Sequence, residues 1–295
     1  MTSRKQFWAV TALLSVAVVW GAAFVLMKDA IVKQPFMDFL ATRFLIATAI
    51  MIIAKPSVLK AFNRRLVGKG VILGLLLSIS YITQTIGLEL STAAISGFLT
   101  GLYVVFTPLV GYLLLRRKVR PRLLVGVVLA TAGLTFISYN GGAIEPSHLW
   151  LIACALLFAG HIVGLSKFSP NEDPYALTVI QLAVVGITNF IPAVVDGGYT
   201  APPDLSVWFA VLFTAVFSTA VAFFVQTWAQ GIMDASRVSI ILITEVLFTA
   251  IMAVAVGQET LQGKTIIGGI MMITAMAWVE WPTRDKPDYS EPLPH

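Results

Sequence analysis

The chain has 295 residues, of which 58% are hydrophobic and only 12% are charged. A soluble domain carries about 25% charged residues, so this composition excludes a soluble domain of any size. The net charge of +5 comes from basic residues in short stretches between apolar segments. That pattern is a topology signal of membrane proteins, and it does not indicate nucleic-acid binding.

Apolar stretches recur along almost the whole chain, each long enough to cross about 30 Å of hydrocarbon as a helix. Turn signals and charges divide them into ten predicted membrane helices. In chain order they cover residues 7–27, 37–54, 70–88, 93–115, 122–139, 148–165, 175–195, 205–229, 237–256 and 265–281. We therefore predict an all-α polytopic membrane protein with ten transmembrane helices.

An internal repeat relates the two halves of the chain. A shift of 142 residues places Gln84-Thr85 on Gln226-Thr227 without a gap. The same shift relates further positions: Ala93 and Ala235, Val104 and Val246, Phe106-Thr107 and Phe248-Thr249, Gly126 and Gly268. We predict a first five-helix repeat over residues 1–141, a second over 142–281, and a disordered cytoplasmic tail over 282–295.

The distribution of Lys and Arg predicts how the two halves lie in the membrane. Ten basic residues follow the second and fourth spans: Lys55, Lys60, Arg64, Arg65, Lys69, Arg116, Arg117, Lys118, Arg120 and Arg122. With Arg4 and Lys5, they place these loops and both termini in the cytoplasm. The corresponding loops of the second half, residues 196–204 and 257–264, contain no basic residue and one basic residue. This charge reversal predicts two repeats of opposite orientation, an architecture typical of alternating-access carriers.

Three stretches resemble the motifs of a known family: Trp20 to Phe24, Gly97 to Leu109, and Thr244 to Phe248 with the following Gly257-Gln258-Glu259 and Gly268. In this order and spacing they resemble the drug/metabolite transporter superfamily, in its ten-helix EamA-type branch. The resemblance covers almost the whole chain. It implies export of small solutes by a multi-pass protein of the bacterial inner membrane. YddG-type amino-acid exporters are the nearest functional match.

Two charged residues lie well inside the predicted spans, and a charge there costs at least about 2.5–3.5 kcal/mol. Glu245, in the ninth span, is interpreted either as a site for a substrate ammonium or a proton, or as a structural partner. Arg43, in the second span, lies close enough to its end to extend toward the membrane surface. For Arg43 we favour a structural or gating role.

The fourth span carries a polar face, because Ser96, Thr100, Tyr103 and Thr107 follow helical spacing. The shift of 142 residues places Tyr103 on Glu245, so the related helix is polar on the same face. We interpret this face as the lining of a hydrated cavity. Hydrogen bonding between helices is the alternative.

Polar residues also cluster on one side of the third span, where Ser78, Tyr81 and Gln84 lie within two turns. Gln226 in the eighth span is related to Gln84 by the repeat. These two glutamines are either paired cavity residues or a symmetric packing contact.

Four single residues complete the set of notable positions within the spans. Trp20 is a candidate for the aromatic lining of the cavity, and His161 is either a proton relay or a hydrogen-bonding partner of a neighbouring helix. Pro108 predicts an interruption of the fourth span after Thr107 and permits a kink there. Cys154 is the only cysteine, which excludes a disulfide within the chain and a metal site built from cysteines.

These observations predict a secondary transporter that exports small organic solutes, with amino acids as the best substrate, by alternating access around a cavity at the bilayer midplane. The expected partners are a small-molecule substrate and the lipid bilayer, with no nucleic acid, no cofactor and no metal. The chain is expected to function as a monomer. It is not expected to be an enzyme. A multidrug or cation efflux carrier, a channel and a nucleotide-sugar antiporter remain as alternatives. No phosphate-binding glycine loop or hydrolytic constellation accompanies the spans.

Overall fold

A computed structural model of the chain describes residues 2–116, 121–138, 146–195, 198–257, 260 and 263–280. The predicted boundary between residues 141 and 142 and the predicted tail 282–295 lie outside these ranges, as do Arg117, Lys118, Arg120 and Glu259.

Helices make up every regular element in the described part of the chain. The first half contains α1 (Thr2–Ile31), α2 (Phe36–Ala54), η1 (Pro56–Ala61), α3 (Arg64–Glu89), α4 (Ala93–Gly101), α5 (Tyr103–Leu115) and α6 (Pro121–Ser138). The second half contains α7 (Pro146–Phe168), η2 (Ser169–Asn171), α8 (Pro174–Val195), α9 (Leu205–Phe213), η3 (Thr214–Val221), α10 (Ala222–Gln230), α11 (Ala235–Leu242), α12 (Glu245–Ala255) and α13 (Gly263–Glu280).

The ten predicted spans are confirmed as ten helical passages through the bundle. Eight of them are long and apolar enough to cross a membrane, and the other two contain shorter apolar stretches within α6 and α13. Three passages are composite: α4 continues into α5, α9 into α10 through the π-helix η3, and α11 into α12. The interruption predicted at Pro108 is wrong, because α5 continues through Pro108 and the break lies earlier, at Leu102.

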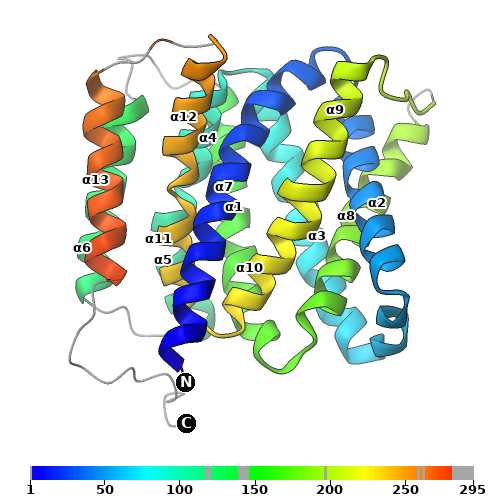
Figure 1. Cartoon of the computed structure of the whole chain (residues 1–295), viewed down its shortest axis with the longest axis horizontal. Coiled ribbons are helices and arrows are strands. Elements are labelled where there is room, and N and C mark those ends of the chain that lie inside the picture. The colour runs from blue at the N-terminus through cyan, green and yellow to red at the C-terminus, as the bar shows by residue number, and fades with distance from the viewer. Residues whose placement is uncertain are drawn as a thin grey trace.

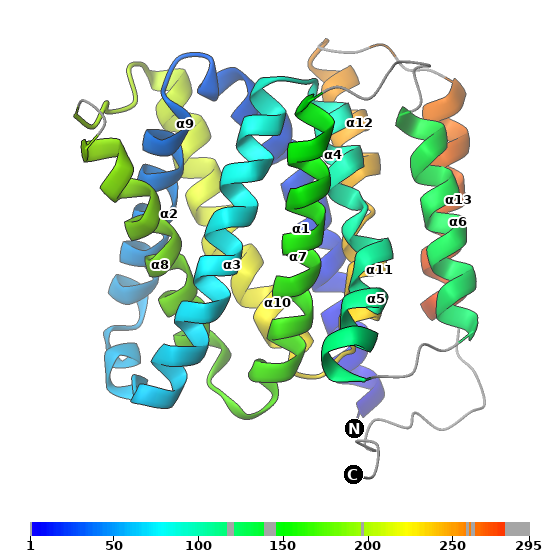
Figure 2. The ribbon, with the colours of Figure 1, turned by 180° about the vertical axis from the view of Figure 1, so that it is seen from behind.

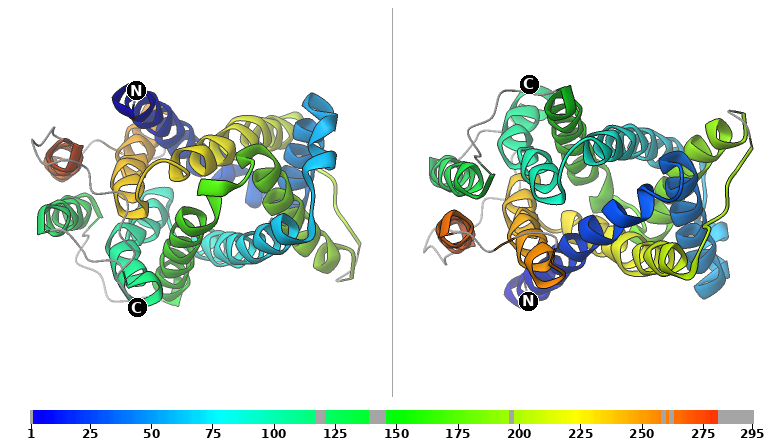
Figure 3. Two further views of the ribbon diagram at one scale, coloured as in Figure 1. Left: turned by 90° about the horizontal axis from the view of Figure 1, so that it is seen from below. Right: turned by 90° about the horizontal axis from the view of Figure 1, so that it is seen from above.

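The two halves run in opposite directions through the bundle. Helix α1 rises from the lower to the upper edge of Figure 1, whereas α7, the first helix of the second half, descends in the view from behind (Figure 2). The packing follows the same inverted symmetry, since α5 packs on α7 as α12 packs on α1, and α3 packs on α8 as η3 packs on α2. Seen along the bundle axis, α6 and α13 form a peripheral pair beside the remaining helices (Figure 3).

Ion pairs connect the two halves at both ends of the bundle. At the upper end, Lys33 contacts Asp204 at 2.9 Å, and the Asp204 carboxylate also accepts hydrogen bonds from the Ser206 hydroxyl and the Val207 amide. Together the Ser206 and Val207 hydrogen bonds and Lys33 hold the pKa of Asp204 well below its usual range. At the lower end, Lys69 contacts Glu172 at 2.6 Å. These contacts join α1–α2 to α9, and α3 to the α7–α8 connection.

Close packing of α1 on α12 depends on Gly21. A Cβ atom at this position would lie 2.7 Å from the backbone nitrogen of Thr249, a distance that real Cβ contacts do not reach. We expect Gly21→Ala to lower stability by about 1–3 kcal/mol, because the backbone of α12 cannot yield without separating the helices. Gly160→Ala in α7 is the matched control, since no atom lies within 4 Å of its added Cβ. Thermal unfolding of the two variants in detergent tests this, and equal melting temperatures would contradict it.

Candidate functional site

Two membrane passages break at positions related by the internal repeat. Helix α5 begins at Tyr103 after the break at Leu102, and α12 begins at Glu245 after the break at Ile243 and Thr244. The shift of 142 residues that relates the halves places Tyr103 on Glu245. Irregular backbone at membrane depth is tolerated only where protein buries it or where it lines a cavity. Here both half-helices begin with a polar side chain directed into the bundle.

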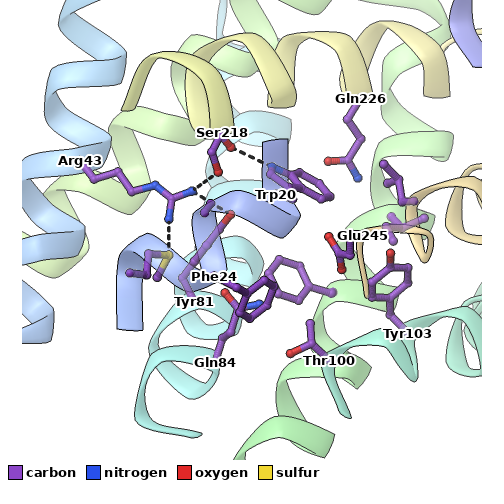
Figure 4. A pocket seen from close by; sticks show the side chains of 15 residues that line it. Trp20, Phe24, Arg43, Tyr81, Gln84, Thr100, Tyr103, Ser218, Gln226 and Glu245 are labelled. Carbon is purple, nitrogen blue, oxygen red and sulfur yellow. Dashed lines mark hydrogen bonds between the residues drawn. The ribbon is translucent and has the colours of Figure 1, made fainter. Parts of the chain in front are cut away.

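A cavity lies between these breaks, with about 510 Å³ of space unfilled by protein atoms, including space continuous with the exterior. Its lining comes from both halves: Trp20, Ala23, Phe24, Met27, Arg43, Tyr81, Gln84, Thr100, Tyr103, Phe158, Ile162, Ser218, Gln226, Leu242 and Glu245. Figure 4 shows the labelled side chains converging on this space from different helices. Repeat-related residues line it in pairs, since the same shift takes Gln84 to Gln226 and Thr100 to Leu242.

Seven of the ten predicted site residues line this cavity: Trp20, Tyr81, Gln84, Thr100, Tyr103, Gln226 and Glu245. Their proximity follows from the tertiary structure, because they lie on six different helical segments. Contact of these residues with a transported solute remains a prediction.

The other three predicted residues lie outside the lining. Ser78 contacts the Thr188 hydroxyl at 2.7 Å and connects α3 to α8, and Ser96 contacts the Ser91 hydroxyl at 2.8 Å. The Nε2 atom of His161 lies 2.7 Å from the Gln181 side-chain oxygen. The structure therefore gives each of these three a local hydrogen-bonding partner away from the cavity wall.

Arg43 belongs to the cavity, and the expectation that it extends toward the membrane surface is wrong. Its side chain is buried, with 1% relative exposure. The guanidinium donates to the Thr219 hydroxyl at 2.7 Å, to the Ser218 hydroxyl at 3.0 Å and to the Met27 sulfur at 3.0 Å. It also lies over the Tyr81 ring, 5.0 Å from the ring centre, which is a cation–π contact.

The π-helix η3 provides the partners that hold Arg43. Ser218 and Thr219 both lie in η3, and π-helical segments occur frequently at functional sites. The Ser218 carbonyl also accepts a hydrogen bond from the Trp20 indole at 2.9 Å (Figure 4). One turn of η3 therefore orients both an arginine from α2 and a tryptophan from α1 at the cavity wall.

Two ionisable side chains, one basic and one acidic, face the cavity from different halves of the chain. Arg43 comes from α2 in the first half and Glu245 from α12 in the second, and Figure 4 shows them on opposite sides of the space. Neither forms an ion pair within the residues that the structure describes. The Tyr103 hydroxyl lies beside the Glu245 carboxyl group in Figure 4. The cavity thus offers a guanidinium on one side, a carboxyl group on the other and further polar groups along its wall.

Several lining residues were not identified from the sequence. They are Ser218 and the apolar residues Ala23, Phe24, Met27, Phe158, Ile162 and Leu242. Apolar side chains that face a cavity have the same sequence pattern as those that face lipid or a neighbouring helix. For Arg43 the available signal was its charge within a span, but its hydroxyl partners lie about 175 residues away in the chain.

A metal site does not emerge from the described residues, where no three His, Cys, Asp or Glu side chains lie close enough together to hold an ion. The chemistry available in the cavity is therefore charge pairing, hydrogen bonding and aromatic contact.

Known proteins share both the sequence pattern and the fold. The EamA-like transporter family matches residues 7–139 and again 146–281. An "Uncharacterized transporter" of Archaeoglobus fulgidus is 30% identical over 273 residues, covering 92% of this chain and 85% of that protein. The "Uncharacterized transporter YetK" of Bacillus subtilis is 25% identical over 245 residues, covering 78% of this chain and 73% of that protein.

A solved crystal structure superposes with a TM-score of 0.75 at 18% identity, covering 92% of this chain and 96% of that one. At this identity the similarity concerns the fold alone. The two family matches span both halves of the chain and agree with the repeat. This chain belongs to the EamA-like transporter family, and it is a multi-pass membrane transporter.

Proposed function

We propose that the protein is a secondary carrier that exports small zwitterionic solutes, with amino acids as the principal substrates. The observation that supports this proposal most directly is the position of Arg43 and Glu245 on opposite sides of one cavity. A zwitterion carries a carboxylate and an ammonium, so it complements both groups at once. Arginine binds carboxylates through paired N–H donors in a planar geometry.

The hydrogen bonds of Arg43 leave room for such a ligand. Four of its five N–H donors are directed at the neutral side chains of Thr219, Ser218, Met27 and Tyr81. The Met27 sulfur is a weak acceptor, and Tyr81 is 3.4 Å away. A carboxylate can therefore replace the two weakest contacts and gain charge-assisted hydrogen bonds.

Transport follows from rocking of one half against the other, with the cavity exposed alternately on each side. We place both termini in the cytoplasm of a bacterial inner membrane, and we infer that a single chain forms the complete pathway because both halves contribute to its lining. Reporter fusions at the two ends of the chain test the orientation.

Counterflow in proteoliposomes tests the proposed activity. We expect labelled amino acid outside to accumulate in vesicles preloaded with the same unlabelled amino acid, and to saturate with concentration. Liposomes of the same lipid composition that contain no protein give the background. Absence of counterflow for every amino acid in a complete panel would refute the substrate assignment and leave the family assignment intact.

A carrier for lipophilic cations is the second candidate. Glu245 supplies an anionic end, and Trp20, Phe24, Tyr81 and Phe158 supply aromatic walls that attract cations. The buried positive charge of Arg43 opposes this assignment. Resistance of cells to lipophilic cations that disappears in Glu245→Gln would favour it over amino-acid export.

A further inference from the structure

A seam of buried polar side chains extends from the cavity toward the lower end of the bundle. Four atoms in it have no hydrogen-bond partner within the described residues: His161 Nδ1, Ser169 Oγ, Gln226 Oε1 and Gln230 Oε1. All four side chains are at least 96% buried. A buried polar group left unpaired costs about 1–3 kcal/mol, and the large majority of buried side-chain polar atoms in native proteins have a hydrogen-bond partner. Four of them along one path call for an explanation.

The contacts of Gln226, Gln230 and Ser169 place them along one line between α7 and α10. His161 of α7 borders this line, because its ring centroid lies 6.1 Å from that of Phe223 in α10. Gln226 lines the cavity, as does Ile162 of α7. One turn after Gln226, the Gln230 amide donates to the Ile162 carbonyl at 2.6 Å and joins the two helices. Beyond Gln230, a Cβ atom on Gly231 would lie 3.8 Å from the Ser169 carbonyl oxygen. The line therefore begins at the cavity and ends at η2, in the connection at the lower edge of Figure 1.

Packing of the fold does not itself require a polar group at position 230. The repeat places Leu88 where Gln230 stands, and Leu88 is fully buried in an apolar cluster. The same structural position thus accepts an apolar residue in the first half and holds an amide in the second. An apolar residue at position 230 would avoid the cost of the unpaired oxygen, so a function that needs a polar surface accounts for the glutamine better than packing does.

We propose that this seam is the path by which solute and water pass between the cavity and the end of the bundle where α1 begins. The hydrogen bond from Gln230 to Ile162 is the contact that separates when the path opens. In the open state, four side-chain groups face water and replace solvation that the solute loses. They are the amides of Gln226 and Gln230, the imidazole of His161 and the hydroxyl of Ser169. The inference rests on the proposed carrier function, but not on the identity of the substrate.

Cysteine labelling tests the path directly. Cys154 is the only cysteine and is buried, so Cys154→Ala provides a suitable background. We introduce Gln226→Cys or Gln230→Cys and add a membrane-impermeant cationic thiol reagent to either side of oriented vesicles. Thr227→Cys is the matched control, because Thr227 is adjacent and fully buried but bonds to Thr178 outside the seam. Val221→Cys, on the outer face of η3, reports lipid exposure.

We expect both seam cysteines to react from the side of the α1 N-terminus at least about tenfold faster than either control, because only a hydrated thiol ionises and reacts. A second variant separates a path from a structural contact. Adding Gln230→Leu, the residue found at the related position 88, should reduce the labelling of Gln226→Cys by at least about tenfold while the protein remains monodisperse, because the reagent then has to pass a dry section.

Equal labelling of seam and control cysteines, or labelling from the opposite side only, would overturn the proposal. Unchanged labelling of Gln226→Cys in the Gln230→Leu protein would also overturn it. These outcomes are independent of the counterflow assay: labelling without amino-acid counterflow would refute the proposed substrate and support the path, whereas counterflow without labelling would refute the path alone.

Discussion

Replacement of Arg43 with glutamine is expected to weaken amino-acid counterflow by about ten- to a hundredfold in half-saturating concentration. A hydrogen bond to a charged group contributes about 1.5–3 kcal/mol, and each 1.4 kcal/mol is a factor of ten in affinity. Glutamine keeps hydrogen-bonding capacity toward Ser218 and Thr219, which now bind the guanidinium, but it lacks the positive charge that a substrate carboxylate requires. Arg43→Lys is expected to rescue little, because a lysine cannot provide the planar paired donors.

The control for this experiment is Arg65→Gln, which removes an exposed arginine at the start of α3, away from the cavity. Amino-acid amides, which lack the carboxylate, should be transported equally by the wild type and by Arg43→Gln. The melting temperature of Arg43→Gln should not fall, because removal of a buried charge without an ionic partner relieves a desolvation cost. Full counterflow with unchanged half-saturation would show that Arg43 does not bind the substrate.

Replacement of Glu245 with glutamine is expected to produce the complementary loss. The variant should lose about ten- to a hundredfold in half-saturation for amino acids, by the same reasoning on charged hydrogen bonds. N-acetylated amino acids, which have no ammonium, should show no such loss. The two variants together form a crossed design. Arg43→Gln is tested with a substrate that lacks the carboxylate, and Glu245→Gln is tested with a substrate that lacks the ammonium.

Two other results would assign Glu245 a different role. If the variant still exchanges amino acids at the wild-type half-saturation but no longer accumulates them when a proton gradient is imposed, Glu245 couples transport to protons and does not bind the ammonium. If the variant is less stable and the surviving protein transports normally, Glu245 is a structural group. Flux with and without a proton gradient, measured alongside thermal unfolding, distinguishes these outcomes.

Most of the architecture follows from local properties of the chain. A membrane helix must satisfy its backbone hydrogen bonds internally, so length and hydrophobicity are sufficient to locate it. The ten predicted spans agree with the observed helices, and the repeat detected at Gln84 and Gln226 correctly anticipates the paired packing of the two halves. The breaks at Leu102 and Thr244 were not anticipated, because neither contains the proline that would have signalled an interruption.

Polar residues within the spans indicate function only in part. Tyr103 and Glu245 were identified as cavity candidates because they are polar and related by the repeat, and both line the cavity. Ser78 and Ser96 are likewise polar side chains on the polar faces of predicted spans, but they bond to neighbouring hydroxyls instead of lining the cavity. A serine that lines a cavity and one that connects two helices do not differ in sequence, since both are polar groups that avoid lipid.

The sequence by itself determined that this is a ten-helix membrane protein of two inverted halves and that it resembles the EamA-like family, because hydrophobic length, loop charge and a repeat are properties of contiguous residues. The tertiary structure alone decided that Arg43 lies in the cavity and that it faces Glu245 across it. The physical reason is that the position of a buried charge depends on its partners. For Arg43 these are the hydroxyls of a π-helix about 175 residues away, and no local pattern in α2 records where that helix packs.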